Sequence, residues 1–146
     1  MLDGLFVTPS VIAITEALAS ARADGPIAVV GNAKLAAALG ASREVIPVGM
    51  SARAARKLRG AVPDLAAVEP ASLAAVVGTE LAVAAGWEDT LRAWSRVIRS
   101  GGAIVIVDRG RPFEASRRAL CGGLTEIEQR RAGRSLITSG VVSHLE

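Results

Sequence analysis

The stretch LRAWSRVIRSGGAIVIVD, residues 91–108, decides the fold class of this chain. Apolar residues recur at helical spacing through Ile98, which predicts an amphipathic helix. Gly101 and Gly102 follow Ser100 and predict the end of that helix, because glycine readily takes the left-handed conformation of a C-cap. Residues 103–107 contain no polar position, which predicts a strand covered on both faces, as in a parallel sheet flanked by helices. We therefore expect an α/β fold.

The composition is that of one small globular domain. The chain has 146 residues, of which 51% are hydrophobic but only 3% aromatic, so we expect a core of closely packed small aliphatic side chains. We expect a single domain over residues 1–144. Leu145 and Glu146 are interpreted as a cloning scar without a role in the fold.

The scarcity of reactive residues excludes several classes of site. Cys121 is the only cysteine, which excludes an internal disulfide and favours a reducing compartment, so we expect a cytoplasmic protein. His144 is the only histidine, so no Ser/His/Asp or metal-ligand constellation is expected. The amino terminus lacks the pattern of a signal peptide, and no apolar run approaches the roughly 20 residues of a membrane span. We expect no membrane association.

Charge is distributed unevenly along the chain. Residues 1–91 carry 7 Lys or Arg against 9 acids, whereas residues 92–146 carry 10 Arg against 5 acids. Arg130, Arg131 and Arg134 form the candidate surface for an acidic partner. A nucleic-acid partner is not expected, because no aromatic residues are interleaved with the basic ones to stack on bases.

Strands and helices alternate over the first two thirds of the chain. A first helix is predicted from Thr8 as N-cap and Pro9 as first helical residue to about residue 23. Short apolar runs and the helical segments after them then predict strands at 27–30, 45–48 and 73–77 and helices at 33–39 and 52–59. Pro47 cannot donate a ladder hydrogen bond, so the second strand is expected near a sheet edge and a third strand beyond it short or absent.

The last part of the chain has a different pattern. Residues 113–120 predict a helix, and residues 124–131 and 135–143 predict two strands joined by a short link that contains Gly133. Two such runs predict an antiparallel hairpin. The expected architecture is a Rossmann-like three-layer sandwich whose mostly parallel sheet ends in an antiparallel C-terminal hairpin.

This order of elements resembles that of class I S-adenosylmethionine-dependent methyltransferases. The residues WSRVIRSGGAIVIVD, 94–108, are similar to the helix, Gly-Gly and strand before the family's fifth strand, and residues 122–142 resemble its last two strands. The resemblance implies a cofactor site at the ends of the first, second and fourth strands. If S-adenosylmethionine binds, the residues it implies as contacts are Gly31, Asn32, Gly49, Met50, Gly78 and Thr79.

Two departures from the family pattern predict a degraded cofactor site. The turn after the first strand has one glycine, Gly31, where the family has several, and Leu35 adds a side chain close to it. The second strand ends in Val48 without the acidic residue that accepts hydrogen bonds from the cofactor's ribose in the family. We therefore expect no cofactor, or S-adenosylmethionine if the chain is active.

Two acids at the ends of strands have more than one interpretation. Glu80 is the weak candidate for a catalytic residue, as a general base, or it is a solvated acid in the first turn of a following helix. Asp108 ends its strand in the cleft, or it pairs with Arg109 or Arg111 at the surface. Cys121 is interpreted as a packing residue at a helix end, and His144 as exposed.

Three functional hypotheses follow. The first is a methyltransferase-like domain that does not catalyse a reaction and acts as a protein-interaction or scaffolding module. Its expected partner is another protein or a second copy of the chain. The second is an active small methyltransferase, since methyl transfer depends mainly on alignment of the reacting groups. The third is a Rossmann-like domain that binds another small ligand.

Overall fold

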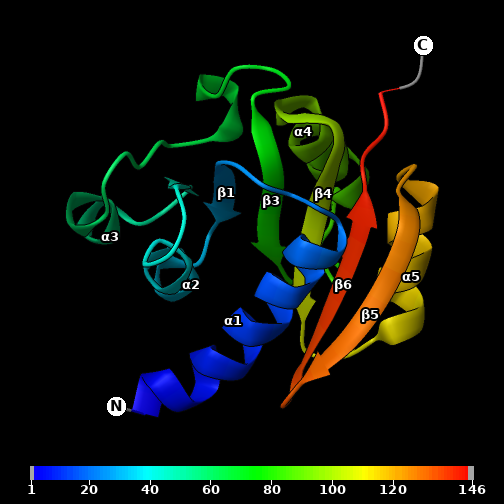
Figure 1. The fold of residues 1–146 in the computed structure, drawn as a ribbon, viewed down its shortest axis with the longest axis horizontal. Coiled ribbons are helices and arrows are strands. Elements are labelled where there is room, and N and C mark those ends of the chain that lie inside the picture. Colours follow the sequence, from blue (N-terminus) through cyan, green and yellow to red (C-terminus); the bar gives the residue numbers. More distant parts are fainter. Residues whose placement is uncertain (1, 145–146) are drawn as a thin grey trace.

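The computed structural model describes the backbone of residues 2–144 and the side chains of residues 9–144, so Leu145 and Glu146 lie outside the described residues. A six-stranded sheet runs through the molecule (Figure 1). Its strands are β1 (Ile27–Val30), β2 (Val45–Val48), β3 (Leu73–Thr79), β4 (Ile98–Asp108), β5 (Thr125–Ala132) and β6 (Ser135–Val141). The helices are α1 (Leu2–Ser20), α2 (Ala33–Leu39), α3 (Ala52–Lys57), α4 (Trp87–Val97) and α5 (Pro112–Cys121), with a 3-10 turn η1 (Leu65–Ala67).

The sheet order is β2-β1-β3-β4-β6-β5. β2, β1, β3 and β4 are parallel, and β6 inserts antiparallel between β4 and β5. This confirms the expected parallel sheet with a C-terminal antiparallel hairpin. The strand order reverses between β1 and β3, which is where open α/β sheets bind ligands beyond the carboxyl ends of their strands.

β2 lies at one edge of the sheet, as Pro47 predicted. Beyond it, the described residues form only an isolated parallel bridge between Val48 and Val62, so the expected short or absent third strand is confirmed. Pro47 has no N–H to donate, and Pro63 limits pairing on the other side. The sheet therefore ends with four residues of strand and one bridge.

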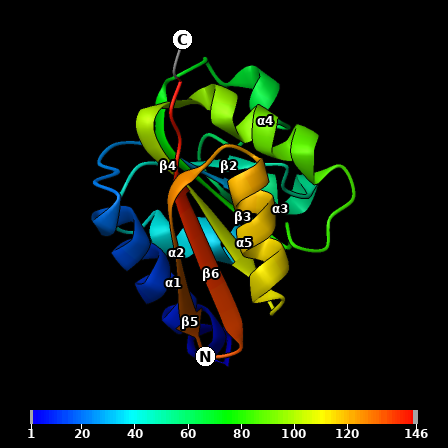
Figure 2. The same ribbon diagram turned by 90° about the vertical axis from the view of Figure 1, so that its right-hand side faces the viewer.

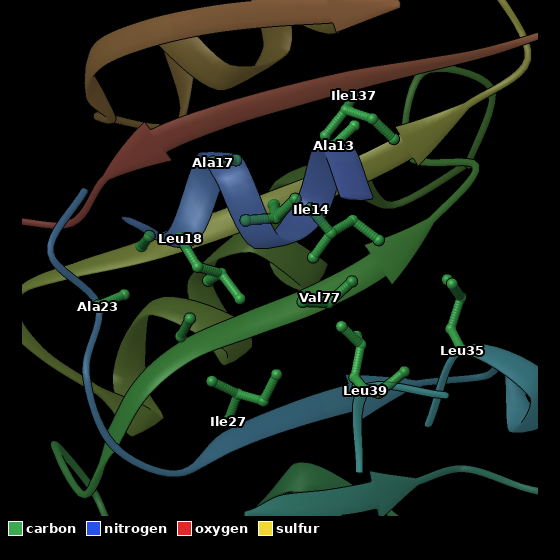
Figure 3. Packing of buried hydrophobic residues seen from close by; sticks show 14 of the residues in the cluster. Ala13, Ile14, Ala17, Leu18, Ala23, Ile27, Leu35, Leu39, Val77 and Ile137 are labelled. Carbon is green, nitrogen blue, oxygen red and sulfur yellow. The ribbon is translucent and has the colours of Figure 1, made fainter. Parts of the chain in front are cut away.

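Helices cover both faces of the sheet, which makes the expected three layers (Figure 2). On one face α1 and α2 pack on the sheet, and Figure 3 shows Ile14 and Leu18 of α1 over the strands, near Ile27 and Val77. On the other face η1, α4 and α5 contribute Leu65, Trp94 and Ala119, among others, to a second core. None of the helices in residues 2–144 is long and apolar enough to cross a membrane.

The start of α1 differs from the prediction. The helix begins at Leu2, so Thr8 is not its N-cap and Pro9 lies inside it. An internal proline removes one helical hydrogen bond and costs about 3 kcal/mol. Burial of Ile14 and Leu18, which are 0% and 1% exposed, stabilises the helix after Pro9 and outweighs that local cost.

The glycines of the opening stretch also have a different role. α4 ends at Val97, so Gly101 and Gly102 are not its C-cap but belong to β4. Gly101 has a φ of +89°, and a Cβ on Gly102 would lie 2.5 Å from the carbonyl oxygen of Ala74. The glycines therefore allow β4 to bend and to approach β3 closely, where the register between the two strands shifts.

Candidate functional site

A cleft of about 360 Å³ opens at the carboxyl ends of β1, β3 and β4. This position is the switch point of the sheet, and the volume lies within the roughly 300–1,000 Å³ of small-molecule sites. Its polar lining comes from α1, the β1–α2 turn, the ends of β3 and β4 and the start of β6. Those residues include Ser10, Asn32, Thr79, Glu80, Asp108 and Ser135.

The turn between β1 and α2 is built around Gly31 and Asn32. Gly31 has a φ of +71° and donates its N–H to Val48 O at 2.8 Å. Asn32 caps α2, because its Oδ1 accepts from the N–H of Leu35 at 3.0 Å. The Leu35 side chain is buried against the core under α1 and α2, and Leu35 also lines the cleft beside the turn.

The end of β2 contributes no residue to the cleft. Val48 is 3% exposed, and Met50 packs against the core under α1 and α2. Gly49 has a φ of +67° and donates its N–H to Val62 O at 3.1 Å. Among the described residues, the only acids that line the cleft are Glu80 and Asp108, at the opposite side from β2.

Gly78 and Thr79 end β3 in different environments. Gly78 is buried, and a Cβ there would lie 2.6 Å from Cζ2 of Trp94, so its bare backbone lets α4 pack on the sheet. Thr79 lines the cleft. Of the six residues that the resemblance implied as cofactor contacts, Asn32 and Thr79 line the cleft, whereas Gly31, Gly49, Met50 and Gly78 do not.

Glu80 follows β3 in a left-handed conformation. Its φ is +58°, its N–H donates to Val107 O at 2.8 Å, and its Oε1 lies 3.9 Å from Nε of Arg109. Residues 81–84 form turns, so the alternative that Glu80 begins a helix is wrong. A positive φ costs a non-glycine residue about 1–3 kcal/mol, so the surrounding structure must hold the residue in this conformation. Such strained residues are enriched at functional sites.

Asp108 ends β4 in the cleft wall and is 2% exposed. Its Oδ1 accepts from the N–H of Ala82 at 3.0 Å, whereas its Oδ2 is buried without a hydrogen-bond partner. Burial raises the pKa of the Asp108 carboxyl, and the negative charge of Glu80 raises it further; the Ala82 hydrogen bond and Arg118 oppose this rise. The alternative of a surface pair with Arg109 or Arg111 is therefore wrong.

The other candidate residues lie away from this cleft. Arg130 on β5 pairs with Glu128 at 2.9 Å, while Arg131 and Arg134 are exposed along β5 and in the hairpin turn. Cys121 is exposed at the end of α5, so its interpretation as a packing residue is wrong, because the last turn of α5 presents it to solvent. His144 is exposed, as expected, although its Nε2 lies 2.6 Å from Ile98 O.

The lining of the cleft includes two serines that the sequence pattern did not indicate. Ser10 comes from α1 and Ser135 from the start of β6, and both reach the cleft only through tertiary packing. A serine in a helix or at a strand start carries no local signal of such a role. No group of three or more potential metal ligands occurs in the part of the chain that the structure describes.

No protein-family model matches the sequence, and no curated protein matches it either. Solved structures are similar in fold. A chain of the Haloferax volcanii complex between the Trm112 methyltransferase activator and a methyltransferase superposes with a TM-score of 0.68 at 15% identity, with 84% of this chain and 83% of that chain covered.

Two further solved structures are also similar in fold. A SAM-dependent methyltransferase from Thermotoga maritima has a TM-score of 0.65 at 13% identity and covers 82% of this chain and 82% of its own. PigF with SAH has a TM-score of 0.63 at 14% identity, over 80% of this chain and 56% of that chain. The described chain therefore has the Rossmann-like fold of class I S-adenosylmethionine-dependent methyltransferases.

Proposed function

We propose that this methyltransferase-fold domain does not transfer methyl groups and acts as a binding module for another protein. The observation that carries the proposal is the extent of the cleft, which is lined from β1, β3 and β4 but not from β2. S-adenosylmethionine needs the β2 side of the switch point for its ribose. There the chain offers Val48, buried in the core, and Met50, packed against it.

The energetics support the same proposal. A ribose bound beside Val48 would lose charge-assisted hydrogen bonds that contribute about 1.5–3 kcal/mol each. Two such bonds amount to roughly two to four orders of magnitude in dissociation constant. Asn32 does not compensate for this loss, because its neutral amide oxygen, which also accepts from Leu35 N–H, is a weaker acceptor than a carboxylate. These residues do not fit the whole cofactor.

A second candidate function, S-adenosylmethionine-dependent methyl transfer, is favoured by the polar half of the cleft. Glu80 and Asp108 lie at the carboxyl edge of the sheet, and the structurally similar PigF holds SAH. In this alternative Glu80, whose half-exposed side chain lines the cleft, would accept the proton of the methylated group. Alignment of the nucleophile would supply most of the rate.

Calorimetric titration with S-adenosylmethionine and S-adenosylhomocysteine tests the proposal. We expect no saturable binding at millimolar ligand. Saturable micromolar binding would overturn the proposal and support the second candidate. In that case Glu80→Gln, which removes the proton acceptor, would slow methyl transfer, and Glu69→Gln, an exposed acid outside the cleft, is the matched control.

The setting of the domain is part of the proposal. Cys121 is an exposed free thiol, which suits a reducing compartment such as the cytoplasm. The partner is a protein, and a second copy of this chain is one candidate that light scattering at high micromolar concentration identifies by its doubled mass.

A further inference from the structure

A larger cavity, of about 540 Å³, lies along the outer edge of β2 and away from the switch-point cleft. We refer to it as the β2 groove. Its walls come from α2, from β2 and the residues just before it, and from the end of α3 and the residues that follow. Figure 1 shows α3 at the margin of the fold beyond α2 and β2, and none of its residues is buried. The groove thus occupies the place where a further strand would extend the sheet.

The backbone of β2 is only partly paired on this side. Val62 N–H donates to Pro47 O at 2.9 Å, and Gly49 N–H donates to Val62 O at 3.1 Å, which closes the carboxyl half of the edge. Ladder groups alternate between the two sides of a strand, so the N–H and C=O of Val45 face the same outer side as the C=O of Pro47. Val45 lines the β2 groove, and the edge of β2 at this residue is open to an added strand.

The side chains of the groove combine an apolar floor with a basic rim. Val45 and Leu58 are half-buried apolar residues that line it and pack against the core under α1 and α2, whereas the side chain of Ile46 packs on the opposite face of the sheet. Lys57 and Arg59 line it and are exposed, and Arg43 adds a third cation against the single acid Glu44. The net positive charge of this lining is complementary to an acidic ligand.

We propose that the β2 groove binds an extended, acidic segment of a partner protein as an added strand. The segment pairs its backbone with Val45, lays apolar side chains on Val45 and Leu58, and directs its carboxylates to Lys57 and Arg59. A nucleic acid fits less well, because no aromatic residue lines the groove to stack on bases. The inference rests on the proposed binding role, but its test is independent of the cofactor titration.

The test uses a fluorescein-labelled peptide of alternating Glu and Val, titrated with the full chain and followed by fluorescence anisotropy. We expect saturable binding that weakens as salt is raised, and slower hydrogen exchange of the Val45 amide in the complex. The charge reversal K57E/R59E is expected to weaken binding about tenfold or more. A peptide of alternating Lys and Val is expected not to bind.

Arg53→Glu is the matched control, because Arg53 lies on α3 and is exposed but does not line the groove. This variant is expected to change affinity less than the double reversal. The proposal is overturned if K57E/R59E binds as tightly as the unmodified chain, if the Val45 amide is unaffected, or if a single-stranded oligonucleotide binds the groove in preference to the peptide. Dimerisation through β2, seen as a doubled mass that K57E/R59E abolishes, would overturn it in favour of a second copy.

Discussion

At the scale of single residues, the ends of β3 and β4 show how much a sequence pattern can assign. The apolar run before Asp108 predicted a buried strand, and hence that this acid stands at the carboxyl edge of the sheet. Its partner could not be predicted, because Ala82 is 26 residues away and its N–H reaches Asp108 only through the turns after β3. Gly78 likewise matched a cofactor position in sequence, although it lies beneath Trp94.

The buried carboxyl of Asp108 makes stability depend on pH. Its pKa is raised in the folded state, so the folded chain holds this proton more tightly than the unfolded chain. The resulting stabilisation is fully present below the ordinary pKa of 3.8 and is lost as pH rises through the raised value. Asp108→Asn keeps an oxygen for the Ala82 N–H but does not titrate. As pH increases, we therefore expect the free energy of unfolding of this variant to rise relative to that of the unmodified chain.

Urea denaturation at several values between about pH 4 and pH 8 measures this difference. The exposed Asp89, whose side chain is 86% accessible, provides the control variant Asp89→Asn. If the difference in free energy of unfolding between Asp108→Asn and the unmodified chain is constant over this range, the pKa of Asp108 is the same in the folded and unfolded states, which contradicts the prediction.

At the scale of elements, the apolar runs were sufficient to locate the strands, but glycine was ambiguous. The predicted strands at 27–30 and 45–48 coincide with β1 and β2, because each is a short run of apolar residues bounded by turn residues. Gly101 and Gly102 suit both a helix C-cap and a bend in a strand. Only the packing of β4 against Ala74 of β3 distinguishes the two roles, and that contact is not visible in local sequence.

The turn segment 81–84 is held by α5 through Arg118. Its Nη1 donates to Leu81 O at 2.6 Å and to Ala84 O at 2.9 Å, and its guanidinium lies 5.3 Å from the centre of the Trp87 ring. Hydrogen bonds from a charged donor contribute about 1.5–3 kcal/mol. We expect Arg118→Ala to lower the free energy of unfolding by about 2–3 kcal/mol and to speed hydrogen exchange of the Ala82 amide.

Arg117→Ala is the control, because Arg117 also pairs with Glu114 but its side chain is 55% exposed. The hydrogen bonds from Arg117 and Arg118 together lower the pKa of Glu114 to about 2. An exposed pair contributes about 0–1 kcal/mol, so Arg117→Ala is expected to cost less than Arg118→Ala. Equal losses in the two variants would mean that the carbonyl contacts of Arg118 add nothing to the stability of the turn.

At the scale of the whole molecule, the sheet lies between two hydrophobic cores and contributes side chains to both. Alternate residues of β3 and β4 point to opposite faces, so Val77 belongs to the core under α1 while Val76 belongs to the core under α4. The sequence predicted this covering on both faces from the absence of polar positions in residues 103–107. It did not predict the β2 groove, which depends on where the chain after α3 passes the sheet edge.

This shared sheet predicts that the two cores unfold together. Ile14 of α1 is 0% exposed, so Ile14→Ala should lower the free energy of unfolding by about 2–5 kcal/mol. Both tryptophans, Trp87 and Trp94, lie on α4 at the opposite face, so their fluorescence reports on the other core. Because α1 holds one face of the strands on which α4 packs, we expect fluorescence and far-UV circular dichroism to show the same lowered transition. Ile12 lies on the same helix but is 54% exposed, so Ile12→Ala should change the free energy of unfolding by no more than about 0.5 kcal/mol. If Ile14→Ala left the fluorescence transition unchanged, the α4 face would fold independently of α1.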